Sequence, residues 1–306
     1  MTVTPALKLR AGRHTVEINR PDKVLFPQDG ITKADLAEYY RGAAPRMLPH
    51  LRRRPLMMER HPDGIDGEGF MQKDVPDHFP DWVHTAELPK EDGTVTHALC
   101  DDTATLLYLA DQACITPHRW LAKADRPDCP DRLVFDLDPP DRDFAPVREA
   151  AGQLHELLDE LQLPSALMTT GSRGLHVLVP LDRRAPFDDV RAFAREAAEL
   201  LAARHPDSLT TEPRKQARHG RLYLDVQRNA YAQTAVAPYA VRALPGAPVA
   251  APLAWPELDE PGLTARQWTI RTIGDRLGHD PWQDAPRRGR SLAPARRRLA
   301  ALRDGD

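Results

Sequence analysis

Prolines divide this chain into short segments, because thirty of its 306 residues are proline and they are spread along its whole length. A proline lacks a backbone N–H and fixes one backbone dihedral, so it tends to end helices and strands. The chain is therefore expected to fold from many short elements. Its length is enough for one large domain or two small ones with a sizeable core.

Apolar runs and amphipathic stretches alternate in the second half of the chain. In order they are the strand 133–137, the helix 147–161, the strand 175–181, the helix 190–201 and the strand 221–226. This β-α-β-α-β order predicts an α/β (α+β) fold in which helices cover a sheet. Near the N-terminus, Thr32 and Asp35 fit a capping box and predict a further helix.

The chain is expected to divide near the segment 124–131, which is rich in Pro and Asp. The predicted parts are an N-terminal module of about residues 1–125 and a catalytic module of about residues 126–283. The Pro-, Gly- and Ala-rich segment 284–306 carries many arginines and is expected to be a flexible basic tail.

The composition is ordinary for a globular protein, with 41% hydrophobic and 28% charged residues. The longest apolar runs are too short to span a membrane, and the N-terminus lacks the apolar region of a signal peptide. A cytoplasmic location is therefore expected. Cys100, Cys114 and Cys129 form no CxxC pair, which favours isolated thiols over a disulfide framework or a four-cysteine zinc site.

The net charge of −3 argues against indiscriminate binding to nucleic acid, but the positive charge is clustered. Basic residues crowd the segments 41–60, 214–228 and 287–303. Charge runs of this kind are usually solvated surface, so the clusters alone identify no binding site.

The strongest local signal is the sequence LVFDLDPPD at residues 133–141. Alternate side chains of a strand share a face, so Asp136 and Asp138 project together, roughly 6–7 Å apart. Two such carboxylates repel each other unless a cation lies between them, and hard divalent ions prefer oxygen ligands. The segment indicates a Mg²⁺ or Mn²⁺ site, although an exposed acidic turn after a buried strand has the same pattern.

A second signal is the sequence TGSRGLH at residues 170–176, which leads into an apolar run. Its glycines allow the backbone to approach a ligand closely, and Thr170, Ser172, Arg173 and His176 can donate to phosphate oxygens. The alternative is a simple turn into a strand, with His176 in the core. The spacing is not that of a Walker A loop.

A third carboxylate, Asp225, ends the run RLYLD. Alternation places it on one face with Arg221 and Tyr223, where it completes a ligand set for two metal ions. Two such ions can activate an attacking oxygen and stabilise a leaving phosphate. Arg242, in the later sequence APYAVR, is suited to bidentate pairing with a triphosphate.

In this order, the motifs resemble the polymerase domain of bacterial DNA ligase D, a member of the archaeo-eukaryotic primase superfamily. The resemblance extends over residues 13–283 and includes DKVLFP, RHPDGIDGEGFMQK, SRGLHVLVPL and WTIRTIGDRL. It implies a primase-polymerase fold, with an RRM-like catalytic sheet packed with helices and an N-terminal αβ module. The chain is too short to include a ligase domain as well, so a stand-alone polymerase subunit is expected.

The resemblance also implies roles for matching residues. Asp136, Asp138 and Asp225 match the catalytic, metal-binding carboxylates. The implied nucleotide-binding residues are His118, Thr170, Ser172, Arg173, His176, Arg218, Arg228 and Arg242. The implied DNA-binding residues are Lys23 and Lys33 at a 5′-phosphate, Phe70 stacked on the template, and Lys73. Thr170 replaces the usual Ser, and Met71 replaces a second Phe of the stacking platform.

The implied function is DNA-directed nucleotidyl transfer that extends 3′ ends at DNA breaks in non-homologous end joining. The mechanism would use two Mg²⁺ or Mn²⁺ ions, with ribonucleotides favoured. The implied partners are DNA ends with a 5′-phosphate, nucleoside triphosphates, Ku and a separate ATP-dependent DNA ligase, with no membrane. The expected location is the nucleoid in the cytoplasm.

Two other functions remain open. FDLDPPD resembles the nucleophile motif of haloacid dehalogenase phosphatases. That motif usually lies near the N-terminus, however, and it has Thr or Val where this chain has Pro140. The other is a non-catalytic scaffold that binds DNA ends on the same fold. Such a protein would have no physical reason to keep three mutually repelling carboxylates. Metal-dependent incorporation of a nucleotide into a primed duplex separates these possibilities.

Overall fold

The computed structural model describes residues 4–141, 143–285 and 288–305 of a chain that forms two compact units. Unit 1 comprises residues 1–125, 234–251 and 268–280, and unit 2 comprises residues 126–233, 252–267 and 281–306. This division differs from the predicted succession of two modules, because two later segments return to unit 1. The pairing of residues 234–236 with a strand of unit 1 accounts for the first of these returns.

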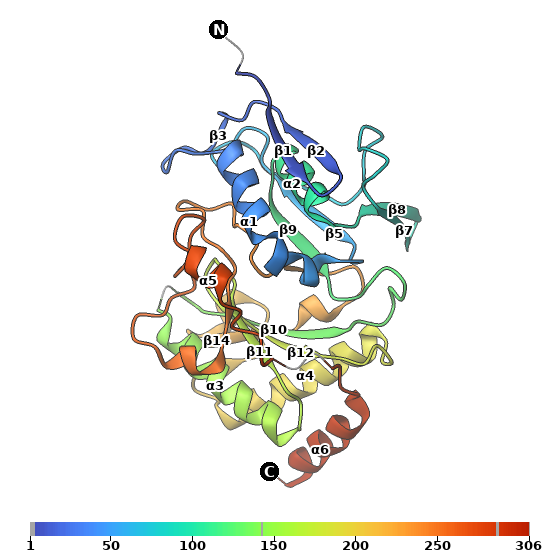
Figure 1. Cartoon of the computed structure of the whole chain (residues 1–306). Coiled ribbons are helices and arrows are strands. Elements are labelled where there is room, and N and C mark those ends of the chain that lie inside the picture. Colours follow the sequence, from blue (N-terminus) through green and yellow to red (C-terminus); the bar gives the residue numbers. More distant parts are fainter. Residues whose placement is uncertain (1–3, 142, 286–287, 306) are drawn as a thin grey trace. The chain divides into compact units, whose positions relative to one another are not determined.

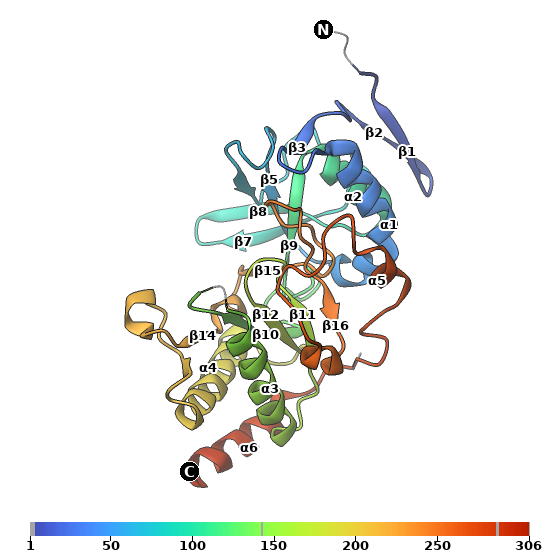
Figure 2. The same ribbon diagram turned by 90° about the vertical axis from the view of Figure 1, so that its left-hand side faces the viewer.

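Unit 1 is built on a four-stranded antiparallel sheet of order β15-β9-β5-β6 and on two helices that pack on each other (Figures 1 and 2). Its helices are α1 (Lys33–Leu51), α2 (Thr103–Asp111) and α5 (Gly274–Gly278). Its sheet strands are β5 (Leu56–Arg60), β6 (Phe70–Gln72), β9 (Cys114–Trp120) and β15 (Thr234–Val236). Three two-stranded pairs complete it: β1 (Leu7–Ala11) with β2 (His14–Ile18), β3 (Val24–Phe26) with β4 (Ile31–Thr32), and β7 (Thr85–Lys90) with β8 (Gly93–Ala98).

Helix α1 begins where the sequence predicts it. The Thr32 hydroxyl accepts from the Asp35 amide at 3.2 Å, and the Asp35 carboxylate accepts from the Thr32 amide at 2.8 Å. Both bonds satisfy donors that a helix start leaves without an intrahelical partner. The predicted capping box is therefore confirmed.

Unit 2 contains a six-stranded sheet of order β13-β14-β10-β12-β11-β16. Its strands are β10 (Arg132–Asp138), β11 (Ala166–Thr169), β12 (Leu175–Pro180), β13 (Leu209–Thr210), β14 (Leu222–Asp225) and β16 (Pro252–Leu253). Its helices are α3 (Ala145–Glu160), α4 (Phe187–Arg204), α6 (Leu292–Gly305) and the 3-10 turns η1 (Lys215–Arg218), η2 (Gln227–Asn229) and η3 (Trp255–Asp259). All neighbouring strands are antiparallel except β13 and β14.

The chain order β10-α3-β11-β12-α4-β14, with β14-β10-β12-β11 as neighbours, is the βαββαβ arrangement of RRM-like folds. The predicted α+β class is thus confirmed. Helices α3 and α4 cover one face of the sheet (Figure 1). On β10, Leu133, Phe135 and Leu137 are fully buried, whereas Asp136 and Asp138 lie on the other face and stay partly exposed. This alternation leaves a sheet face on which acidic side chains can meet a ligand.

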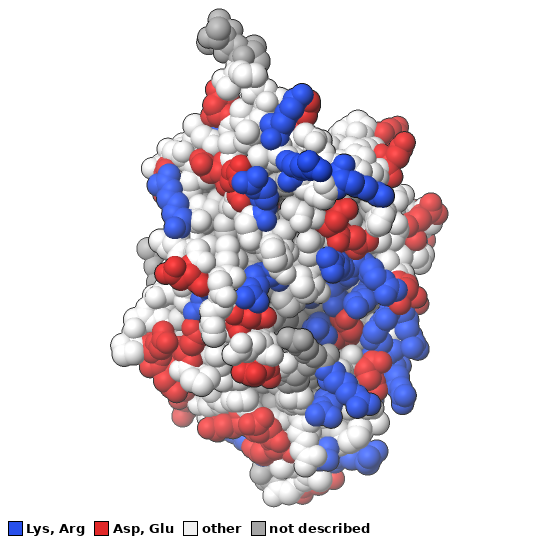
Figure 3. Space-filling model, viewed as in Figure 1, with Lys and Arg blue, Asp and Glu red and all other residues white. Residues whose placement is uncertain are grey.

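The C-terminal segment differs from the flexible tail predicted for residues 284–306. Residues 292–305 form helix α6, which packs on α4 through the buried Leu292, Ala295 and Leu299. The helical spacing of these three apolar residues is hard to recognise in the sequence, because arginines surround them. Basic side chains gather at this end of unit 2 (Figure 3). Residues 286, 287 and 306 of the predicted tail lie outside the described residues.

No helix among the described residues combines the length and the apolar character needed to cross a membrane.

The packing of α6 predicts unequal effects of two leucine substitutions on the same helix. Leu299→Ala should lower the free energy of unfolding by about 2–5 kcal/mol, because Leu299 is fully buried. Leu302→Ala, at a partly exposed position, should cost clearly less. Urea unfolding followed by circular dichroism measures both. Equal and negligible effects would show that α6 does not pack on unit 2.

Candidate active site

The predicted carboxylates meet on the open face of the unit 2 sheet. Antiparallel pairing of β10 with β14 sets Asp136 directly opposite Asp225, and Asp138 opposite Tyr223. Burial raises the pKa of Asp225, a hydrogen bond from the Gln227 backbone opposes this, and the negative charge of Asp136 raises it further. The two carboxylates are therefore close enough to repel each other, as the sequence analysis expected.

Four cationic or imidazole side chains surround these acids. Arg173 and Arg218 hold the two oxygens of Asp138 at 2.9 and 3.0 Å. His176 and Arg228 approach Asp136 at 3.5 and 3.6 Å. Burial alone would raise the pKa of Asp136, but His176 and then Arg228 hold this pKa below its usual value. All four residues are among those predicted from the sequence, and the structure brings them together with the acids.

Arg218 is positioned by its own loop. Its guanidinium donates to the backbone oxygens of Glu212 and Pro213 at 3.2 and 2.9 Å, and it lies 4.1 Å from the centre of the Tyr223 ring. These contacts bury Arg218 and leave one nitrogen for Asp138. A side chain fixed in this way loses little freedom when it binds an anion.

The loop TGSRG is closed by its own hydroxyl group. The Thr170 hydroxyl donates to the Gly174 carbonyl at 3.1 Å and accepts from the Ser172 and Gly174 amides at 3.2 Å each. Its described contacts thus organise the loop, whereas the resemblance implied a contact with the nucleotide. Gly174 is needed here because a Cβ atom would overlap the Leu137 carbonyl oxygen of β10.

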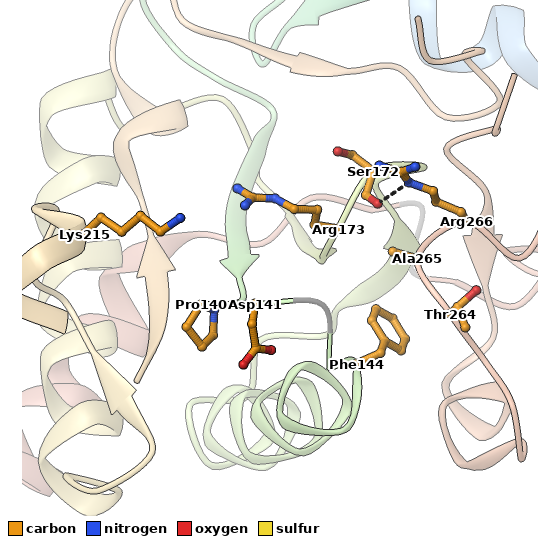
Figure 4. Close-up of a pocket in the computed structure, with 9 residues that line it drawn as sticks. All are labelled: Pro140, Asp141, Phe144, Ser172, Arg173, Lys215, Thr264, Ala265 and Arg266. Atoms are coloured by element: carbon orange, nitrogen blue, oxygen red, sulfur yellow. Dashed lines mark hydrogen bonds between the residues drawn. The ribbon is translucent and has the colours of Figure 1, made fainter. Parts of the chain in front are cut away.

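A cavity of about 660 Å³ opens within unit 2 beside Arg173, one of the two arginines that pair with Asp138. Its lining residues are Pro140, Asp141, Phe144, Ser172, Arg173, Lys215, Thr264, Ala265 and Arg266. Figure 4 shows Lys215 and Arg266 on opposite sides of this cavity, with Phe144 at the start of α3. Arg266 also holds the Ser172 carbonyl at 2.9 Å. Three basic groups, one acid and an aromatic ring suit a ligand that carries both phosphates and a ring.

The acids suit a hard divalent cation by their chemistry, because carboxylate oxygens are the ligands that Mg²⁺ and Mn²⁺ prefer. The placement of Asp136 directly opposite Asp225 in the β10–β14 pair is an observation that fits such an ion. Within the described residues, however, no group of three or more His, Cys, Asp or Glu side chains is assembled tightly enough to hold a metal. The described partners of the Asp138 carboxylate are Arg173 and Arg218.

Unit 1 holds a second cluster, around His118 on β9. The His118 Nε2 atom lies 3.1 Å from Glu59 on the neighbouring strand β5, and His61 Nε2 lies 3.4 Å from the other oxygen of Glu59. Burial alone would raise the pKa of Glu59, but His118, with smaller effects of Thr116 and Arg242, lowers it to about 2. Arg242 thus lies near the same carboxylate. Sequence reasoning missed Glu59, because the sequence LMMER does not show that its strand pairs with β9, which carries His118.

The two predicted phosphate lysines have different surroundings. Lys33 is buried and donates to the Asp111 carbonyl at 2.7 Å, while Lys23 pairs with Asp63 at 2.7 Å. Burial lowers the pKa of Lys33, and the charge of Asp111 raises it. A cavity of about 270 Å³ lies at Lys33, and the arginines Arg20 and Arg60 line it. Sequence reasoning missed both arginines as members of this cluster.

The predicted stacking residues lie on the surface of β6. Phe70 and Met71 are among the few large apolar side chains that are exposed, at 45% and 53%. The Arg60 guanidinium lies 5.3 Å from the centre of the Phe70 ring. Lys73, just after β6, is exposed as well. Exposed apolar groups beside cations are suited to stacking on bases, but the DNA-binding roles of these residues stay predictions.

The RRM-like sheet and its paired acids define a primase-polymerase domain, a nucleotidyltransferase. The model of the family described as "LigD, primase-polymerase domain" matches residues 32–282, and the chain belongs to this family. The LigD protein of Mycobacterium tuberculosis strain H37Rv, named as a multifunctional non-homologous end joining DNA repair protein, is 33% identical over 279 residues. The LigD proteins of Pseudomonas aeruginosa and Bacillus subtilis are each 35% identical, over 296 and 260 residues.

These relatives are longer proteins. The matches cover 88%, 95% and 84% of this chain but only 36%, 35% and 41% of the three relatives. A solved structure, the polymerase domain from M. tuberculosis ligase D in complex with DNA, is similar with a TM-score of 0.83 and 32% identity. That match covers 89% of this chain and 99% of the solved one. The predicted family and fold are thus confirmed, and the dehalogenase-like phosphatase is excluded.

The low pKa of Glu59 predicts how its charge contributes to stability. A carboxyl group whose pKa falls on folding stabilises the protein above its unfolded pKa, near 4.5, and loses this effect as the pH falls towards about 2. Glu59→Gln should therefore lower the free energy of unfolding by up to about 3 kcal/mol at pH 7. The difference from the unsubstituted protein should shrink below pH about 4.5. Urea titrations at several pH values measure it, and a difference that does not change with pH would contradict the pairing.

Proposed function

We propose that this chain adds nucleotides to the 3′ end of a DNA strand by a two-metal mechanism. The observation that carries the proposal is the cross-strand placement of Asp136 opposite Asp225, with Asp138 on the same face of β10. These acids would hold two Mg²⁺ or Mn²⁺ ions. Bound there, the ions would supply activation of the attacking hydroxyl and stabilisation of the leaving phosphate.

The remaining residues of the cluster act on the negative charge of the nucleotide. Arg173, Arg218 and Arg228 already bind carboxylates, and the same guanidinium groups can bind phosphate oxygens bidentately. Ser172 lies in the same loop as Arg173, and His176 lies in the strand β12 that follows this loop. The proposed nucleotide-binding residues of unit 1 are His118 and Arg242. In unit 2, Thr170 is proposed to bind the nucleotide as well as to close its loop. Preference for ribonucleotides rests on the family resemblance alone.

We further propose that the DNA is a broken end with a 5′-phosphate, in non-homologous end joining. The names of the LigD relatives and the DNA in the similar solved structure support this. The cationic cavity at Lys33 supports it as well, because Arg20, Lys33 and Arg60 together favour a phosphate. Ku and an ATP-dependent DNA ligase are the proposed partners, and the nucleoid is the proposed place of action.

The carboxylates predict a loss of activity without a loss of folding. Asp136→Asn and Asp138→Asn should each abolish metal-dependent addition of a labelled nucleotide to a primed duplex, because each removes a charged metal ligand. Asp207→Asn, at an exposed position outside the cluster, is the matched control and should keep full turnover. Circular dichroism checks folding. Normal turnover by either folded variant would remove that carboxylate from the mechanism, and an inactive unsubstituted protein would favour the scaffold alternative.

The cavity at Lys33 predicts recognition of the phosphate at a DNA end. A gapped duplex should bind about tenfold more tightly with a downstream 5′-phosphate than with a 5′-hydroxyl, which is the worth of one charge-assisted bond. The double variant Lys23→Ala, Arg20→Ala should erase this difference and leave addition to a simple primer-template intact. Lys33 is left in place because it is buried and bonded to Asp111, so its replacement would lower stability as well as positive charge.

Fluorescence anisotropy at fixed salt measures the two affinities, since phosphate contacts weaken with ionic strength. Arg41→Ala, which breaks an exposed ion pair with Glu38 on α1, is the control for general loss of positive charge. Equal affinities of the unsubstituted protein for the two DNAs would rule out recognition of the 5′-phosphate.

A further inference from the structure

The strand that carries Asp136 and Asp138 is paired unequally along its two edges. On one edge β10 pairs with β12 from Arg132 to Leu137, but on the other it pairs with β14 only from Asp136 to Asp138. Val134 lies beyond this short pairing. A buried backbone N–H and C=O at this position need partners from elsewhere.

The side chain of Asn229 supplies both partners. Its Oδ1 atom accepts from the Val134 amide at 2.9 Å, and its Nδ2 atom donates to the Val134 carbonyl at 2.7 Å. The second hydrogen of Nδ2 goes to the Val226 carbonyl at 3.0 Å. Asn229 is fully buried, so none of these bonds is shared with bulk water. Its amide therefore takes the place of one residue of a neighbouring strand.

This contact lies four residues after Asp225, at the end of the turn η2. The segment 225–229 therefore contacts β10 at two points. The backbone of Asp225 pairs opposite Asp136, and the side chain of Asn229 bonds to Val134. Between these two contacts lies Gln227, whose backbone amide donates to the Asp225 carboxylate at 2.8 Å. The same turn also carries Arg228, whose Nε atom lies 3.6 Å from Asp136.

We propose that Asn229 is a positioning residue that sets the separation of the Asp136 and Asp225 carboxylates. By fixing the end of η2 on β10, it determines where the Asp225 side chain and the Arg228 guanidinium stand relative to Asp136. The inference rests on the proposed function in one respect, namely that these acids bind divalent cations. This positioning role differs from a purely structural one, in which Asn229 would only stabilise the edge of the sheet.

The test uses Asn229→Asp, which keeps the shape of the side chain but removes both N–H donors. The carboxylate would face the carbonyls of Val134 and Val226, so the end of η2 should move away from β10. Hydrogen exchange of the metal-free protein, followed by mass spectrometry, should show faster exchange in residues 132–138. The matched control is Leu299→Ala, which destabilises unit 2 at α6 and touches none of these residues.

The deciding measurement is Mn²⁺ binding by electron paramagnetic resonance, at a temperature where each variant is fully folded. Asn229→Asp should weaken Mn²⁺ binding by about tenfold, which is the size of effect seen when a residue that orients metal ligands is lost. Leu299→Ala should bind Mn²⁺ as the unsubstituted protein does, even if it loses more stability. In nucleotide addition, Asn229→Asp should lower kcat and raise the Mg²⁺ concentration for half-maximal rate, with the KM for primer DNA unchanged.

Three outcomes are informative. Unchanged Mn²⁺ affinity in a folded Asn229→Asp variant would overturn the inference, while the proposed function would stand. No Mn²⁺ binding by the unsubstituted protein would overturn the proposed function and the inference with it. If Asn229→Asp does not fold, the milder Asn229→Ser, which keeps a hydroxyl near Val134, must show the same weakened binding relative to Leu299→Ala. An affinity equal to that of Leu299→Ala would overturn the inference.

Discussion

The pairing of β10 with β14 is the constraint on which the rest of unit 2 depends, because it places Asp136 opposite Asp225. Like charges that face each other across a sheet destabilise it, so the register is tolerable only with compensation nearby. The structure provides it through His176 on β12 and Arg228 in η2. Asp138, two residues further, is compensated separately by Arg173 and Arg218. The loops around the sheet are thus arranged about three acids that a purely structural sheet would avoid.

Much of unit 2 could be predicted from sequence, because its signals are local. Apolar runs and helical periodicity located β10, α3, β12, α4 and β14, and alternation put the acids on one face. The strand β11 was not predicted because its sequence, ALMT, shows no alternation of apolar and polar residues. Helix α6 escaped because three buried positions are set among arginines, so the composition suggested a solvated tail. In both cases packing against a neighbour decided the structure, and sequence periodicity could not show that neighbour.

The parts of the site that sequence reasoning missed depend on contacts between distant segments. Glu59 acts on His118, 59 positions later, only because β5 and β9 are neighbours in the unit 1 sheet. Arg20 and Arg60 reach the cavity of Lys33 from different elements. Thr170 shows the converse case, since its hydroxyl, a predicted nucleotide contact, also forms hydrogen bonds within its own loop. Residue type and spacing name the groups that can bind, but the fold decides which of them are already engaged.

The arginines around the acids are likewise already paired in the structure. Arg173 and Arg218 pair with the two carboxylate oxygens of Asp138, so this acid already has cationic partners. Under the proposed function, divalent cations and guanidinium groups compete for the same carboxylate oxygens. Arg218 is held in place by the Glu212 and Pro213 carbonyls, so its guanidinium group stays beside Asp138. The same guanidinium groups are suited to phosphate oxygens that lie beside these acids. Arginine, and not lysine, suits both states, because its planar fork fits carboxylate and phosphate equally well.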